Sequence, residues 1–133
     1  MKRLHDETGL AGKMIVVWLL VLALIAVAAI DAASIAFTTY KLSDLGAAAA
    51  SEGARVYKRT RDPRDACERV ERLVSGKEPE ANLVRRGCSI EQPTGLVTVA
   101  IRKRASTLIA ERIPWTEDLA MVVVRETAGP PSL

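Results

Sequence analysis

An uninterrupted apolar stretch near the amino terminus constrains this chain more than any other feature. Residues 14–30 form it, and as a helix about 17 residues would be roughly 26 Å long, at the short end of what spans a bilayer. A second framing uses Trp18 and Tyr40, which would lie roughly 33 Å apart along a helix and are residue types that favour membrane interfaces. Asp31 sits at the outer boundary in the first framing and inside the hydrocarbon in the second, where an unpaired charge is costly. The sequence leaves both framings open.

The charges before this stretch predict its orientation. Lys2, Arg3 and Lys13 closely precede it, which favours a cytoplasmic amino terminus. We therefore predict a single-pass protein of the cytoplasmic membrane, with residues 1–13 inside, a transmembrane helix over 14–37 and the remainder outside. A cleaved secretory signal is the alternative, because "AVAAIDAAS" contains small residues that resemble a cleavage site. Its apolar region would normally span only about 7–15 residues, however, and the sequence remains compatible with a helix through Asp31.

Small residues at helical spacing accompany the aspartate. Ala28, Ala32 and Ala36 repeat every four residues, next to Asp31. Such a strip lets helix backbones approach closely in lipid, so we expect these four residues to contact partner helices. The alternative is that alanine is present simply because it forms helices well.

The chain beyond the membrane segment predicts an α+β fold in three parts. Residues 38–61 contain no strong helix breaker, and Leu42, Leu45, Ala49 and Val56 fall near one face, so we expect the membrane helix to continue as a stalk. Pro63 ends it, because the residue before a proline is pushed out of helical geometry. A small extracytoplasmic α+β domain over 62–128 and a flexible tail over 129–133 follow.

Within this domain we predict one helix and a short antiparallel sheet. Asp62 and Pro63 suit the start of a helix, as cap and first residue, and Gly76 suits its end. Strands are predicted over 83–85, 88–91, 96–102 and 119–125, the third with alternating Val97, Val99 and Ile101 that fits a sheet with one face on a helix. A short helix is predicted over 106–112, with a loop as the alternative.

The two cysteines predict a disulfide. A globular part of about 70 residues has a marginal core, and such domains commonly carry a covalent staple. Outside the cytoplasm, Cys67 and Cys88 would most simply pair, and the alternative is two separate buried thiols. A zinc site is not expected, because His5 is the only histidine and lies on the predicted cytoplasmic side.

The sequence offers no arrangement typical of catalysis. Acidic residues at 65, 68 and 71 alternate with arginines, a pattern of solvated ion pairs, and there is no glycine-rich phosphate loop. We predict a protein that is not an enzyme and has no cofactor. The basic clusters at 57–61 and 102–104 are expected to be solvated surface rather than nucleic-acid contacts, with acidic envelope polymers or lipid head groups as other candidates.

Three short motifs carry a family resemblance. They are "AIDAAS", where an acidic residue follows the apolar run, "AAAASEGARVY", which contains Glu52, Gly53, Ala54 and Arg55, and the carboxyl-terminal "LAMVVVRETAGPP". Together they resemble the TadE/TadG-like proteins of tight-adherence (Flp) pilus systems. The resemblance implies a pilin-like fold and a role in pilus assembly or secretion. Its implied partners are the membrane and other membrane proteins of that apparatus, in a homo- or hetero-oligomer.

One departure from the pilin pattern predicts that the amino terminus is retained. Processed pseudopilins usually carry a glutamate shortly after a glycine just inside the apolar segment, but Lys13 and Met14 follow Gly12 here. A retained membrane protein that assists assembly therefore fits better than a major fibre subunit. The alternative function is a membrane-anchored module that binds an envelope ligand and is unrelated to pili.

Overall fold

The computed structural model describes residues 4–130, and side chains from residue 9 onward. Lys2 and Arg3, on which the predicted orientation partly depends, and residues 131–133 of the predicted tail lie outside the described residues. The fold is α+β, as predicted, and its elements are α1 (Leu4–Thr60), α2 (Pro63–Lys77), β1 (Asn82–Glu91), β2 (Leu96–Arg104), the 3-10 helix η1 (Glu117–Ala120) and β3 (Met121–Ala128).

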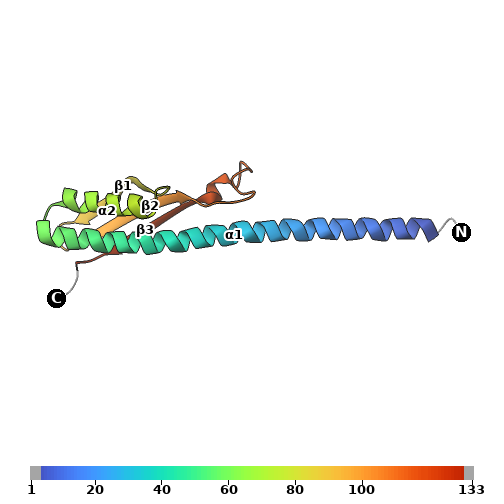
Figure 1. The fold of residues 1–133 in the computed structure, drawn as a ribbon, viewed down its shortest axis with the longest axis horizontal. Helices are drawn as coiled ribbons and strands as arrows, with labels where there is room; N and C mark the ends of the chain where they lie inside the picture. The colour runs from blue at the N-terminus through green and yellow to red at the C-terminus, as the bar shows by residue number, and fades with distance from the viewer. Residues whose placement is uncertain (1–3, 131–133) are drawn as a thin grey trace.

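Helix α1 is continuous over 57 residues, which confirms the prediction that one helix runs through Asp31 and onward. Its first half projects alone from the rest of the molecule, and its second half lies along the domain (Figure 1). By length and composition, α1 is the one helix in the described part of the chain that could cross a membrane. It ends where Arg61 turns to a φ of 57° and donates its backbone N–H to the Tyr57 carbonyl at 2.8 Å.

The predicted stalk over 38–61 is not a separate unit. Its apolar face forms a large part of the core, and Leu42, Ala49 and Ala54 are each at most 1% exposed. Small side chains let α1 approach the sheet closely: a Cβ on Gly46 would lie 3.0 Å from Cγ of Glu126 on β3. The carboxyl-terminal half of α1 is thus a structural part of the domain, which fixes the angle at which the bare half leaves it.

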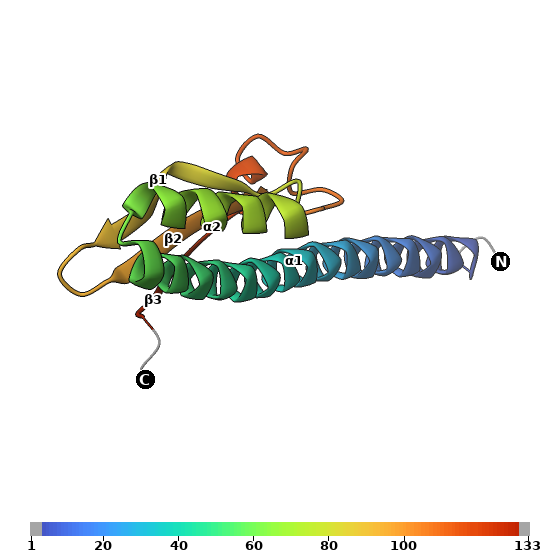
Figure 2. The same ribbon diagram turned by 60° about the vertical axis from the view of Figure 1, so that its left-hand side comes forward.

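The sheet has the strand order β1-β2-β3, and both pairings are antiparallel. Helices α1 and α2 lie on the same side of this sheet (Figures 1 and 2). Val97, Val99 and Ile101 on the central strand β2 are completely buried, which confirms the predicted alternation. These side chains form the centre of a core that also includes Val70 and Val74 from α2.

The structure corrects three expectations about local elements. The predicted strands over 83–85 and 88–91 are one strand, β1, with an irregular register between Leu83 and Cys88, where Arg86 has a φ of 57°. β3 begins at Met121 instead of residue 119, because Leu119 belongs to η1. The helix predicted over 106–112 is wrong, since this segment belongs to an irregular connection between β2 and β3.

Helix α2 and the disulfide agree with the prediction. Asp62 caps α2 by accepting the Arg64 N–H at 2.9 Å, and Pro63 is the first helical residue, although the helix extends one residue past Gly76. The Cys67–Cys88 disulfide joins α2 to β1 across a Cα–Cα distance of 5.8 Å. The bond therefore holds the second helix to an edge strand of the sheet.

Candidate functional site at Asp31 and the loop between β2 and β3

Asp31 is the most deeply buried charged residue of the described chain, with only 6% of its surface exposed. Its carboxylate accepts three backbone hydrogen bonds from the connection between β2 and β3. Oδ1 accepts from the N–H of Leu108 at 2.6 Å, and Oδ2 accepts from Ile109 at 2.9 Å and Ala110 at 3.0 Å. Three donors around one carboxylate are the arrangement that stabilises an ionised acceptor.

These donors belong to the β2–β3 loop, which comprises residues 105–120 and includes η1. Its base is closed by the Ala105 N–H donating to the Ala120 carbonyl at 2.7 Å. Further in, the Thr116 hydroxyl donates to the Ala110 carbonyl at 2.9 Å, and the Thr107 hydroxyl accepts the Glu111 N–H at 3.2 Å. These internal bonds turn consecutive amides toward Asp31, as the first turn of a helix would. The aspartate thus accepts amides at the place where the predicted helix over 106–112 would have begun.

An apolar groove of about 380 Å³ lies between α1 and the β2–β3 loop. On the helix side it is lined by Leu24, Ala28, Asp31, Ala32 and Ile35. On the loop side it is lined chiefly by Ile109, Ala110, Ile113 and Leu119. The loop therefore lies alongside the carboxyl-terminal part of the apolar stretch, toward the bare half of α1, and does not lie over the sheet (Figure 1).

The outer surface of the β2–β3 loop is also apolar. Trp115 is 84% exposed, Leu119 is 63% exposed and Leu108 is 54% exposed. An exposed tryptophan is informative, because this residue usually buries most of its surface. Charged side chains lie among these residues: Glu111 and Arg112 are exposed, and Glu117 lies 3.9 Å from Arg104.

Only some of the residues predicted to pack against partner helices line the groove. Ala28 and Ala32 line the groove beside Asp31, whereas Ala36 is exposed and lies outside the groove lining. The Asp31 carboxylate, which we expected to meet a partner helix, meets the chain's own loop. Contact of the alanine strip with another protein stays a prediction. The loop residues were not identified from the sequence, and the only signal pointing to them was that a charge beside an apolar stretch must find donors.

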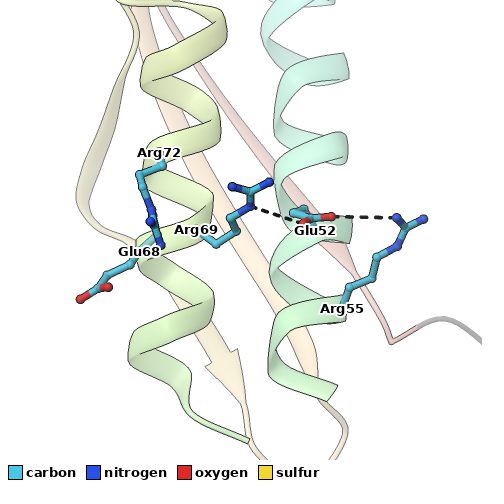
Figure 3. A network of polar contacts seen from close by, with 5 residues as sticks. All are labelled: Glu52, Arg55, Glu68, Arg69 and Arg72. Carbon is cyan, nitrogen blue, oxygen red and sulfur yellow. Dashed lines mark hydrogen bonds and ion pairs between the residues drawn. The ribbon is translucent and has the colours of Figure 1, made fainter. Parts of the chain in front are cut away.

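The second predicted group, Glu52 to Arg55, lies where α1 crosses α2 (Figure 3). Glu52 accepts from Nε of Arg69 on α2 at 3.4 Å and lies 3.9 Å from the guanidinium of Arg55. Ala54 is fully buried. This motif therefore contributes to the packing between the two helices.

Gly53 accounts for the close approach of these elements. A Cβ at this position would lie 2.8 Å from Cγ2 of Val70 on α2 and 3.2 Å from Cγ1 of Val97 on β2. Both distances are shorter than ordinary carbon contacts. The glycine lets α1 rest against the core at the point where helix, helix and sheet meet.

Arginines gather at the far end of α1, away from the bare half of the helix. Arg59, Arg69 and Arg72 line a shallow groove together with Glu52 and Asp65, so that both signs of charge are present. Among the described side chains, no group of three or more histidines, cysteines or acidic residues could hold a metal ion. The charged side chains at this end could bind a ligand of complementary charge.

No protein-family model, curated protein or solved structure matches this chain.

Proposed function

We propose that this chain is a non-enzymatic, single-pass membrane component of a TadE/TadG-like pilus assembly or secretion apparatus. It acts through packing of its membrane helix and through contacts of its extracytoplasmic domain. The domain lies outside the cytoplasmic membrane, and the amino terminus lies inside.

One observation carries the proposal: a single helix supplies both an exposed apolar half and the core of a small α+β domain. Within residues 14–25, the large side chains are about half exposed or more, except Val21 at 41%. Such a continuous apolar surface is unfavourable in water, whereas the hydrocarbon of a bilayer would cover it. From Leu42 onward, one face of the same helix is buried by the sheet and α2. This arrangement supports the pilin-like plan that the sequence motifs imply.

The Asp31 contacts support the first of the two membrane framings. Irregular backbone does not occur in the lipid-exposed hydrocarbon, because its N–H and C=O groups would lack partners. The β2–β3 loop is irregular and is bonded to Asp31. We therefore place the hydrocarbon span mainly over residues 14–30, with Asp31 at the outer boundary.

The position of the Glu52–Arg55 motif supports the family assignment in a physical way. Each of its first three residues has a defined packing role between α1 and α2, so the motif specifies how the membrane helix joins the domain. A protein whose domain is rigidly coupled to its membrane helix can transmit the position of one to the other, which suits an assembly component.

Deletion of the gene in the native host tests the role. We expect surface filaments, or the exported substrate of the apparatus, to be lost and to return when the wild-type chain is restored. Unchanged filaments and unchanged export in the deletion strain would contradict it. An intact mass of the protein purified from membranes tests amino-terminal retention, since removal of residues 1–9 or 1–12 would indicate processing.

The arginine-rich groove favours a second candidate function, an anchored module that binds an acidic envelope polymer. Arg59 and Arg69 would supply the charge. Binding of an anionic polysaccharide to the detergent-solubilised chain, lost in Arg59→Glu and salt-sensitive in the wild type, would favour this candidate. Lys77→Glu, an exposed basic residue at the other end of α2, is the matched control.

A further inference from the structure

We infer that the β2–β3 loop is a second membrane contact, which rests the domain on the head-group region of the outer leaflet. Its ligand is lipid, and Leu108, Trp115 and Leu119 are the residues that meet it. This inference rests on the proposed function only in requiring that α1 spans the membrane.

The β2–β3 loop lies beside the apolar part of α1. The groove shared by helix and loop extends from Ile35 to Leu24, which is roughly 16 Å of helix axis. Leu24 is 63% exposed and belongs to the apolar stretch itself. A bilayer that covers Leu24 must therefore also reach the loop that lines the same groove. Acyl chains or head groups, and not water, would then fill the apolar groove.

The β2–β3 loop also exposes side chains that suit a membrane interface. Trp115 is the most exposed large apolar residue of the described chain, at 84%. Tryptophan is enriched where membrane and water meet, because its ring is apolar and its N–H seeks a partner. Leu108 and Leu119 add further exposed apolar side chains to the same loop. The bare half of α1 extends beyond the loop toward the amino terminus (Figure 1).

Several backbone amides of the loop are already paired within the molecule. The amides of Leu108, Ile109 and Ala110 donate to Asp31, and that of Glu111 donates to Thr107. Pro114 has no N–H to satisfy. A segment with its amides paired in this way loses little when the head-group layer replaces water around it.

The charged side chains of the β2–β3 loop limit how deeply the loop can enter the membrane. Glu111, Arg112 and Asp118 are exposed on the same loop and would be costly within the hydrocarbon. The loop therefore sits in the head-group region, where Trp115 can reach the outermost acyl carbons while the charges stay hydrated. Asp31 then holds the loop at this level from inside the molecule.

Tryptophan quenching in vesicles tests the inference on the full chain. Trp18 and Trp115 are the only two tryptophans, so Trp18→Phe leaves Trp115 as the sole reporter. In phosphatidylcholine and phosphatidylglycerol vesicles, we expect lipids brominated near the head group to quench Trp115 several-fold more than lipids brominated near the chain end. We also expect Trp115 to be shielded from aqueous iodide, relative to the same variant unfolded in denaturant.

Two further variants separate the failure of this inference from that of the proposed function. Trp115→Phe leaves Trp18, which brominated lipids must quench if α1 is in the membrane. Gln92→Trp in a chain lacking both native tryptophans places the reporter in the turn between β1 and β2 and should not be quenched. Quenching of Trp18 but not of Trp115 would overturn the loop contact alone. A lack of quenching at both positions would overturn the membrane span and, with it, the loop contact.

Discussion

The carboxylate of Asp31 accepts the backbone N–H of Ile109, a residue 78 positions further along the chain, at 2.9 Å. This bond and its two neighbours join the end of the apolar stretch to the loop that follows the central strand. Helix α1 is therefore tied to the domain at Asp31 as well as through the core. A charged aspartate would destabilise a plain membrane anchor. Here its hydrogen bonds hold the β2–β3 loop against α1.

The Asp31 bonds predict that Asp31→Leu releases the β2–β3 loop without unfolding the domain. Loss of three charge-assisted bonds should speed hydrogen exchange at residues 108–110 by on the order of tenfold or more. Amides of β2, in the centre of the sheet, should be unchanged. Asp44→Leu, at an exposed aspartate of the same helix, is the matched control. Unchanged exchange at 108–110 in Asp31→Leu would mean that the carboxylate does not hold the loop.

The crossing of α1 and α2 predicts that Gly53→Val destabilises the domain by about 1–3 kcal/mol, because the new side chain would overlap Val70 and Val97. The free energy of unfolding can be measured by denaturant titration in detergent. Gly76→Val is the control, since a Cβ there meets nothing within 4 Å, and it should change stability by less than about 0.5 kcal/mol. Equal effects of the two substitutions would show that close packing at Gly53 is unimportant.

Removal of the Cys67–Cys88 disulfide should lower stability by about 3 kcal/mol in the chain-entropy model, since the bond joins residues separated by 21 positions. Thermal unfolding with and without reductant measures this. The Cys67→Ser/Cys88→Ser double variant should melt at the lower temperature and should not respond to reductant. A wild-type chain whose melting is also insensitive to reductant would indicate that the cysteines are not paired.

The ion pair between Glu78 and Lys103 predicts a pH dependence. The Lys103 ammonium donates to the Glu78 carboxylate at 2.7 Å, and this hydrogen bond holds the pKa of Glu78 below its usual value. The stabilisation is therefore present above the ordinary carboxyl pKa and is lost as the pH falls through the lowered one. Both side chains are partly exposed, so Glu78→Gln should cost at most about 1 kcal/mol at neutral pH.

The difference in unfolding free energy between wild type and Glu78→Gln should narrow as the pH is lowered through this acidic range. Glu80→Gln, at an exposed glutamate two residues away, serves as the control and should follow the wild type. A gap between wild type and Glu78→Gln that stays constant with pH would contradict the ion pair.

The sequence predicts the parts of the fold that local patterns determine. α1 is continuous because no proline interrupts it, α2 begins at Asp62 because a cap and a proline stand together, and β2 is revealed by alternation at Val97, Val99 and Ile101. The disulfide follows from compartment and domain size. Each of these signals lies within a short segment, or in composition, and can be read without knowing the tertiary contacts.

The relationships that the sequence does not reveal are long-range. The pattern at 106–112 suits a helix, but Asp31 takes the amides that would begin it, and nothing nearby in sequence indicates that contact. The sequence predicts two strands where the structure has the single strand β1, because the register shift around Arg86 interrupts the pattern. The apolar face over 38–61 is predicted, but its packing partners are not, because the small residues that allow burial against the sheet also suit an isolated helix.

Cysteine labelling in cells with an intact cytoplasmic membrane tests the central claim most directly. Single cysteines are placed at Gly9→Cys, where a side chain meets nothing within 4 Å, and at Gln92→Cys, in the exposed turn between β1 and β2. The native cysteines are joined in a disulfide and do not react. A membrane-impermeant maleimide should label Gln92→Cys in intact cells and Gly9→Cys only after permeabilisation. Labelling of Gly9→Cys with protection of Gln92→Cys, or free labelling of both, would contradict a helix that crosses the membrane with its domain outside.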